Sequence, residues 1–275
     1  MVSTWLVTGA SSGIGQSISI AALGAGHKVV GATRDIAKAE AANPSFAAQG
    51  GVWIQLDPAH PDSFSHFAKA QKEHNIDVLV NNAGYAFIGG VEDTSEEEVQ
   101  DQLNVNFFGP LRAIRAILPS MRAKRRGHIV LISSGIVQEV KELGIKVLIV
   151  EPGAFRTTWT ANMKSPAAHE STSGFSEGYK GTAVEQWVGP VQAIKSAPLP
   201  DQIKGDPDKA AQEIVRAVVG GHDYLRMVLG HDCVLSAERR LEEIRGDVEA
   251  TRAIAMSTNR EEPGSDNGVT VNAGS

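Results

Sequence analysis

Short apolar runs alternate with helix-compatible stretches along the first 150 residues. Six of these runs are expected to be strands: Trp5 to Val7, Lys28 to Ala32, Val52 to Leu56, Val78 to Val80, Ile129 to Ile132 and Val147 to Val150. Strands that alternate with helices favour a parallel sheet that is covered on both faces. The pattern therefore predicts an α/β fold built on a doubly wound parallel sheet.

The stretch between the fourth and fifth runs predicts one long helix. Thr94 and Glu97 have the spacing of a capping box at its start. Apolar residues then recur at three- and four-residue steps from Phe107 to Met121, which is the period of a helix face. Gly127 is expected to end the helix.

The rest of the chain is expected to belong to a single domain, residues 1–260. Residues 160–205 are rich in Ser, Gly, Pro and Thr and lack a firm period, so they predict a long loop region that covers a substrate site. Residues 261–275 have almost nothing to bury and predict a disordered tail.

Composition and charge narrow the function. The 275 residues are 42% hydrophobic and carry a formal net charge of −6, which offers no basic field for nucleic acid. No apolar run approaches the roughly 20 residues of a membrane span. The one cysteine, Cys233, cannot form an internal disulfide, which fits a reducing compartment. We expect a cytoplasmic protein with no nucleic-acid or membrane partner.

A glycine-rich turn follows the first expected strand and precedes a helical pattern. It reads Thr8-Gly9-Ala10-Ser11-Ser12-Gly13-Ile14-Gly15. Gly9 allows a tight turn, Gly13 lets backbone N–H groups approach a pyrophosphate, and Gly15 permits close packing of the helix. The helix dipole adds to the attraction for an anion. The context of strand, turn and helix predicts a dinucleotide site.

Three ordered motifs resemble the short-chain dehydrogenase/reductase family. They are the glycine turn, Asn81-Asn82-Ala83-Gly84 after the fourth run, and Pro152-Gly153 with Thr157 after the sixth. The similarity extends from about Thr4 to about Ser257. It implies a Rossmann-type fold and an oxidoreductase that transfers hydride between a nicotinamide and a small ketone or alcohol. Such a substrate is a small molecule, and no metal is implied.

The resemblance also implies which residues bind the cofactor. They are the turn residues Gly9, Ser11, Ser12, Gly13, Ile14 and Gly15, then Thr33, Arg34, Asp57, Asn82, Ala83, Gly84, Arg115, Pro152, Gly153, Phe155 and Thr157. Two of these positions have a second interpretation. Asp57 precedes Pro58 and could simply cap a turn. Arg115 could have a surface or interhelix role instead.

The end of the second strand bears on the choice of cofactor. An acid there accepts from the ribose 2′-hydroxyl of NAD, whereas an arginine accommodates the 2′-phosphate of NADP. Thr33 occupies the place of the acid, and Arg34 follows it. We therefore expect NADP(H). NAD(H) is the alternative, because Asp35 lies one residue further and could turn toward a 2′-hydroxyl, and Arg34 could be a solvated loop charge.

The catalytic positions are incomplete. The resemblance assigns the catalytic serine to Ser134 and the supporting asparagine to Asn106. The Tyr-x-x-x-Lys element of the family should follow Ser134 by about a dozen residues. None of the three tyrosines, Tyr85, Tyr179 and Tyr224, has a lysine four residues later. A block of roughly two dozen residues is missing relative to the family pattern.

Geometry supports this interpretation independently. Twelve residues join the end of the fifth strand at Ser134 to the start of the sixth at Val147. That is the lower limit of about 10 to 12 for a parallel crossover. We therefore expect a shortened crossover between strands five and six. In the family the missing helix commonly contributes to the dimer interface, so the resemblance leaves a homo-oligomer possible but weakened.

Two functions remain open at this point. The first is an NADP(H)-dependent oxidoreductase. Such an enzyme either works with a substitute acid, or its gene model lacks a segment that the gene encodes. Alternatively, the chain is a cofactor-binding pseudoenzyme. Tyr179-Lys180 could fold over the pocket as a substitute, or be a solvated loop pair. Tyr85 could line the substrate pocket, or serve only in packing.

Overall fold

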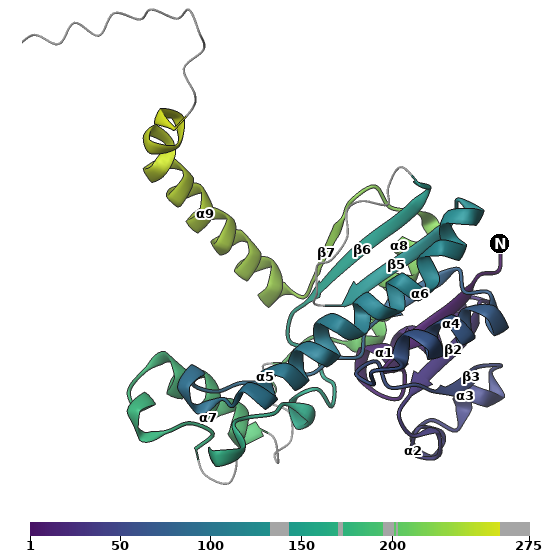
Figure 1. Ribbon diagram of the computed structural model, residues 1–275, viewed down its shortest axis with the longest axis horizontal. Coiled ribbons are helices and arrows are strands. Elements are labelled where there is room, and N and C mark those ends of the chain that lie inside the picture. Colours follow the sequence, from purple (N-terminus) through teal and green to yellow (C-terminus); the bar gives the residue numbers. More distant parts are fainter. Residues whose placement is uncertain (133–142, 170–172, 195–200, 202, 259–275) are drawn as a thin grey trace, which may run out of the picture. The chain divides into compact units, whose positions relative to one another are not determined.

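A computed structural model describes residues 1–132, 143–169, 173–194, 201 and 203–258, and its central feature is a seven-stranded parallel sheet (Figure 1). The strands are β1 (Thr4–Thr8), β2 (Lys28–Thr33), β3 (Val52–Gln55), β4 (Val78–Asn81), β5 (Gly127–Ile132), β6 (Ile145–Pro152) and β7 (Arg226–Leu229). Their order in the sheet is β3-β2-β1-β4-β5-β6-β7. The strand order therefore reverses between β1 and β4, as in a doubly wound Rossmann-type sheet, and the expected fold class is confirmed.

Helices cover both faces of the sheet. On one face α1 (Gly13–Gly24) packs against α8 (Pro207–Gly220), and on the other α4 (Ser63–His74) packs against α6 (Gly109–Lys124). The remaining α-helices of the described residues are α2 (Ile36–Ala42), α3 (Ser45–Ala48), α5 (Glu96–Leu103), α7 (Ala183–Ile194) and α9 (His231–Ser257). Short 3-10 turns lie at Val91–Asp93, Thr160–Asn162, Ala167–His169 and Glu177–Tyr179.

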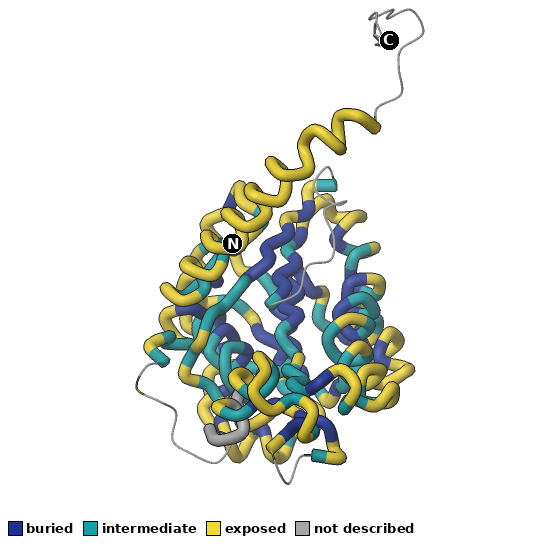
Figure 2. The backbone as a smooth tube through the Cα atoms, turned by 90° about the vertical axis from the view of Figure 1, so that its left-hand side faces the viewer, coloured by how far each residue is buried: buried dark blue, intermediate teal, exposed yellow. Residues whose placement is uncertain are grey.

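The core forms two apolar clusters, one on each face of the sheet. Consecutive strand residues point to opposite faces, so Leu6 joins the cluster under α4 and α6, while Val7 joins the cluster under α1 and α8. Leu79 and Val80 of β4 divide in the same way. Strand β4 is buried at all four positions, and its neighbours β1 and β5 are buried at most of theirs (Figure 2). Burial on both faces explains why these strands appear in the sequence as continuous apolar runs.

The expected long helix before β5 is interrupted. Helix α5 ends at Leu103, a π-helical turn runs over Asn104–Phe108, and α6 begins at Gly109. The capping box is Ser95 with Glu98, one residue later than the sequence predicts. The helix ends at Arg125, which has φ 48°, and Gly127 is the first residue of β5 rather than the stop.

Three elements lie outside the expected pattern. Strand β7 pairs with β6, α7 lies inside the region from 160 to 205 that was expected to be aperiodic, and α9 follows β7 where no helix was expected. By contrast, the expected strands β1 to β6 all form, with ends that shift by a few residues. The expected crossover falls on residues 133–144, and of these 133–142 lie outside the described residues.

The chain divides into two units, Met1–Cys233 and Val234–Ser275. The first contains the sheet and its covering helices. The second contains α9 from Val234 onward, and the expected tail, 261–275, lies outside the described residues. Among the helices that the structure describes, none is both long enough and apolar enough to cross a bilayer.

Candidate functional site

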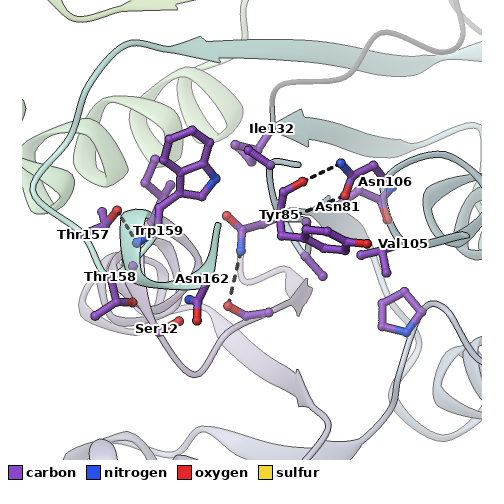
Figure 3. Close-up of a pocket in the computed structure, with 18 of the residues that line it drawn as sticks. Ser12, Asn81, Tyr85, Val105, Asn106, Ile132, Thr157, Thr158, Trp159 and Asn162 are labelled. Carbon is purple, nitrogen blue, oxygen red and sulfur yellow. Dashed lines mark hydrogen bonds between the residues drawn. The ribbon is translucent and has the colours of Figure 1, made fainter. Parts of the chain in front are cut away.

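A pocket of about 880 Å³ opens at the carboxyl ends of the central strands. Asn81, Ile132 and Pro152, which end β4, β5 and β6, all line it, and so do the residues after β1 and β2. This is the point where the strand order reverses, the usual binding crevice of open α/β sheets. Figure 3 shows how side chains from the strand ends and from residues 157–162 meet there.

The glycine turn forms one wall of the pocket. Gly9 has φ +64° and Gly13 has φ +55°, values that side chains other than glycine rarely adopt. Ser11, Ser12, Gly13 and Ile14 line the pocket. Ser12 is the N-cap of α1 but makes no side-chain cap hydrogen bond, so the first amides of this helix are left for an anion.

Close packing behind the turn depends on Gly15. It does not line the pocket, and a Cβ at this position would overlap the Asn82 amide and the Gly9 carbonyl. Asn82 Nδ2 donates to the carbonyl oxygens of Thr8 at 3.0 Å and Gly9 at 3.3 Å. The absence of a side chain at Gly15 therefore lets Asn82 hold the turn in place.

Thr8 ties the turn to the end of β4. Its hydroxyl donates to the Val80 carbonyl at 3.3 Å and accepts from the backbone N–H groups of Asn82 and Ala83, both at 3.0 Å. Asn82, Ala83 and Gly84 all line the pocket. The first two motifs of the sequence thus form one hydrogen-bonded unit.

The far end of the pocket is lined by residues that follow β2 and β3. Thr33, Arg34 and Asp57 lie there; their assignment to the adenosine of a cofactor stays a prediction. Asp57 also caps a turn, because its carboxylate accepts from the Ala59 N–H at 3.0 Å. Asp35 is the N-cap of α2 and accepts from the Lys38 N–H at 3.0 Å. Its carboxylate is therefore engaged by the helix, and Asp35 is not among the pocket residues.

The third motif faces the glycine turn across the pocket. A Cβ at Gly13 would lie 3.4 Å from the side chain of Thr157, so the two segments are in near contact. Pro152, Gly153, Phe155 and Thr157 all line the pocket. Asp232 holds this segment, because its carboxylate accepts from the Ala154 N–H at 2.7 Å.

Asn106 lies in the π-helical turn, where it contacts the segment after β4. Its Oδ1 accepts from the Tyr85 N–H at 3.2 Å, and its Nδ2 donates to the Tyr85 carbonyl at 2.8 Å (Figure 3). A π-turn adds one residue to a helical turn, and such turns are frequent at functional sites. Asn106 lines the pocket but uses its amide to hold the backbone of Tyr85.

Tyr85 packs into the pocket wall. Its ring points toward Val105 in Figure 3, and its hydroxyl is buried with no hydrogen-bond partner among the described residues. Burial raises the pKa of this hydroxyl, and the nearby carboxylates of Asp101 and Glu98 raise it further. Lys164 lies with its ammonium 4.5 Å from the centre of the Tyr85 ring, a cation–π contact.

Part of the pocket is built from the region after β6. Trp159, Asn162 and Lys164 line it, and the last two fall within residues 160–205. That this region covers a substrate stays a prediction. Tyr179 and Lys180 lie elsewhere. The Tyr179 hydroxyl accepts from the Glu92 N–H at 3.5 Å, and Lys180 pairs with Glu177 at 2.7 Å on the surface. The structure does not bring this pair to the pocket.

Two predicted site residues stand apart from this group. Ser134 lies outside the described residues, although Ile132, two positions earlier, lines the pocket. Arg115 is exposed on α6, with its guanidinium 5.9 Å from the centre of the Phe64 ring, and is not among the residues that line the pocket. Its placement fits the surface interpretation.

Sequence reasoning missed three residues of this site. Asp232 follows the third motif by almost 80 positions, and no local pattern links the two. Lys164 and Asn162 fall in a stretch without a period. Backbone hydrogen bonds between Lys164 and the segment at Ala86 and Ile88, each 2.9 Å, bring that stretch to the pocket.

Comparison with known proteins gives consistent matches. The family model for short chain dehydrogenase matches residues 3–139. The oxidoreductase claN from Passalora fulva is 43% identical over 197 residues, covering 62% of this chain and 90% of that protein. This chain is thus similar to an oxidoreductase along nearly all of that relative's length.

Solved structures agree with the sequence matches. A short-chain dehydrogenase from Streptomyces avermitilis has a TM-score of 0.79 and 32% identity, and the match covers 94% of this chain and 100% of that one. A metagenomic short-chain oxidoreductase in complex with NADP has a TM-score of 0.51 and 30% identity, covering 56% of this chain and 83% of that one.

Proposed function

The chain belongs to the short-chain dehydrogenase/reductase family, and we propose from this premise that it binds NADP(H) and serves hydride transfer between nicotinamide and a small ketone or alcohol. The observation that carries the proposal is the single pocket wall formed by the glycine turn, Thr8 and Asn82. This wall presents backbone N–H groups at the start of a helix, which is the environment that a diphosphate requires.

The residues present fit the cofactor. A Cβ at Gly13 would fill the space between the turn and Thr157, so glycine there keeps a cradle open. Arg34 and Asp57 line the end where an adenosine would lie, and Phe155 and Thr157 line the end where a nicotinamide would lie. When bound, NADPH supplies the hydride. The chain's own residues hold its diphosphate and orient its two ends.

The preference for NADP(H) over NAD(H) rests on the contrast between Arg34 and Asp35. Arg34 is exposed and lines the pocket, which suits a 2′-phosphate. The Asp35 carboxylate caps α2, so turning it toward a 2′-hydroxyl would sacrifice a helix cap of about 1 kcal/mol. A structural relative at 30% identity was solved in complex with NADP, which supports the same assignment.

A second candidate function is cofactor binding without efficient turnover. It is favoured by the sequence, in which no tyrosine is followed by a lysine four residues later. The alignment with claN runs over 197 positions but takes in 62% of the 275 residues, about 170, so about 27 aligned positions in total have no residue of this chain opposite them. A positioned general acid contributes about 10² to 10⁴ in rate, so its loss leaves little of the family reaction.

Tyr85 is not a ready substitute for the missing acid. Tyr85 has a buried hydroxyl with a raised pKa, so it holds its proton firmly and does not present it to a substrate. Lys164 can place a positive charge beside a carbonyl oxygen, since its ammonium faces the same wall. For this chain we therefore expect weak or absent turnover on a competent cofactor site.

Calorimetry with NADPH and NADH, together with NADPH oxidation over a panel of small ketones, tests both candidates. Binding of NADPH with oxidation near the background rate supports the pseudoenzyme. Binding with oxidation at rates ordinary for an enzyme supports an active oxidoreductase. Absence of heat with either coenzyme, oxidised or reduced, removes the proposal. Sequencing of the transcript across Ser134 to Gln138 separately decides whether the missing block is encoded.

A further inference from the structure

Helix α9 exposes an apolar surface that nothing in its own unit covers. None of its 27 residues is buried. Leu241 is 62% exposed, Ile244 45% and Val248 50%. A helix of this length gains most of its stability from packing of an amphipathic face, and Gly246 at its middle weakens it by roughly 1 kcal/mol relative to Ala. An exposed apolar face and a weak intrinsic stability are typical of a helix that pairs with another helix.

Four of the seven exposed large apolar residues of α9 follow a seven-residue repeat, and Leu235, Ile254 and Met256 lie off it. Taking Val234 as position a, the a and d positions form a strip that we call the α9 seam: Val234, Ala237, Leu241, Ile244, Val248, Thr251 and Ala255. At about 1.5 Å per residue this seam is about 30 Å long. Gly246 falls at position f, on the side opposite the seam, where it does not interrupt packing. A repeat of seven is the pattern of a helix that pairs with another helix.

The charged residues that flank the α9 seam indicate which helix the seam pairs with and in which orientation. Positions e and g flank the seam and set the orientation of a helix pair. Here e holds Glu238, Arg245 and Arg252, and g holds Arg240, Asp247 and Ile254. When two copies of α9 lie antiparallel with Leu241 opposite Ile244 of the second copy, g faces g and e faces e. Arg240 then meets Asp247 of the second copy, and Glu238 meets Arg245 of the second copy.

Two-fold symmetry doubles these contacts, so four flanking positions of each helix find an opposite charge. A parallel pair would place Asp247 beside Arg252 of the second copy, which is attractive, but also Arg240 beside Arg245 on both sides, which is repulsive, so the antiparallel pair has the better charge match. Arg240 and Arg245 already pair with Glu243 and Glu242 along the helix, at 3.0 Å and 2.9 Å. Glu238 and Asp247 have no ion pair within the part of the chain that the structure describes, so both acids are available.

We propose that α9 is a self-association surface, through which two copies of this chain form a homodimer by antiparallel pairing of their α9 seams. Each copy contributes the same patch, as a two-fold interface requires. This route to a dimer does not use the crossover between β5 and β6. It is independent of cofactor binding and of the proposed function.

Sedimentation of the full chain over a range of concentrations tests the proposal first. The wild-type chain is expected to shift reversibly from monomer to dimer. Leu241→Asp places a charge in the centre of the seam and should abolish the dimer over the same range. Because Leu241 is exposed within the chain, this change disturbs no core. A wild-type chain that stays monomeric, or a dimer unaffected by Leu241→Asp, overturns the proposal.

Charge exchange tests the orientation. Arg240→Glu sets two like charges against Asp247 of the second copy and should raise the dimer dissociation constant by about tenfold. The double variant Arg240→Glu/Asp247→Arg should restore the wild-type value, because the pair is reversed but complementary. In a parallel pair, Arg240→Glu would strengthen the dimer, and this result would overturn the antiparallel assignment.

Arg239→Glu is the matched control for the charge exchange. Arg239 lies next to Arg240 but at position f, away from the seam, so the same change in net charge should leave the dissociation constant within twofold. Single spin labels at Ala253→Cys, in a Cys233→Ala background, give a direct geometric check. Because position f faces away from the seam, parallel helices hold the two labels about 20 Å apart, roughly two helix diameters, whereas antiparallel helices add about 30 Å along the axis and hold them at about 35 Å or more.

Discussion

The two ends of the pocket differ in how completely the chain supplies them. At the nucleotide end, the glycine turn, Thr8 and Asn82 are joined by hydrogen bonds of 3.0 to 3.3 Å. At the hydride-accepting end, Ile132 reaches the pocket, but the sequence after Ser134 lacks the family's Tyr-x-x-x-Lys element. In the function that we propose, cofactor binding and turnover depend on separate segments, so one can be lost while the other is kept.

The largest expected effect comes from filling the nucleotide end. Gly13→Val adds a branched side chain at φ +55°, in the space between the turn and Thr157. We expect NADPH affinity to fall at least a thousandfold, about 4 kcal/mol, because the diphosphate loses access to the backbone N–H groups. Calorimetry with NADPH measures this loss.

Gly26→Val is the control for that change. Gly26 has φ +82°, so the substitution imposes similar backbone strain, but no atom lies within 4 Å of its added Cβ. We expect some loss of stability and wild-type affinity for NADPH. If Gly13→Val binds NADPH as well as Gly26→Val does, the nucleotide end is not where the cofactor binds, and the comparison between the two ends fails.

The next effect concerns the end of β5 that lies away from the pocket. His128 is half-buried near Lys146 and the ring of His222, with 6.2 Å between the two ring centres. Burial, helped by those two basic groups, lowers the pKa of His128 from 6.5 to about 4. The unfolded chain therefore binds a proton more readily between pH 6.5 and about 4, so stability falls as the pH falls through this window.

His128→Gln removes that titration. With allowance for solvent screening, we expect the wild type to lose about 2 kcal/mol more than the variant between pH 7 and pH 4. Urea unfolding at several pH values gives the two slopes. Equal slopes would show that the pairing of β5 with β6 does not enclose His128 in this way.

A smaller effect is expected at the adenosine end. Arg34→Asp exchanges a charge that suits a 2′-phosphate for one that repels it and accepts from a 2′-hydroxyl. We expect the ratio of NADPH to NADH affinity to fall by about tenfold to thirtyfold, about 1.5 to 2 kcal/mol. Titrations with the two coenzymes measure the ratio. Lys38→Asp, on the adjoining helix α2, is a control for charge alone, since Lys38 does not line the pocket.

Local signals made the nucleotide end predictable from the sequence. Gly9 and Gly13 are required by positive φ angles within one turn, and the apolar runs on either side fix the strand and the helix. The role of Asp35 was harder to assign. It is either an acceptor for a ribose 2′-hydroxyl or the N-cap of α2, and the second role depends on where α2 begins. The capping box was misplaced by one residue for a similar reason: Thr94-Ser95 offers two hydroxyls, and only packing selects Ser95.

Contacts between distant segments were not predictable. Asp232 accepts from the Ala154 N–H, and nothing near either residue indicates the pairing. Strand β7 has only four residues, of which Arg226 is exposed, so its apolar pattern is too short to distinguish from a loop. The π-turn that carries Asn106 interrupts a regular helical period without any proline or glycine before Gly109. Each of these features depends on tertiary packing, which single-chain patterns do not encode.

The smallest expected effect is the most informative about the hydride-accepting end of the pocket, where the Tyr-x-x-x-Lys element is missing. In a short-chain dehydrogenase/reductase the catalytic serine acts together with a tyrosine and a lysine. Removal of the serine should therefore lower the rate only when those two partners are present. For this chain we expect Ser134→Ala to change the background rate of NADPH oxidation by less than twofold, with unchanged NADPH affinity. Tyr85→Phe should behave in the same way, because the Tyr85 hydroxyl is buried with a raised pKa. A large loss of rate with Ser134→Ala would mean that a substitute acid works beside it, and an additional loss with Tyr85→Phe would identify that acid.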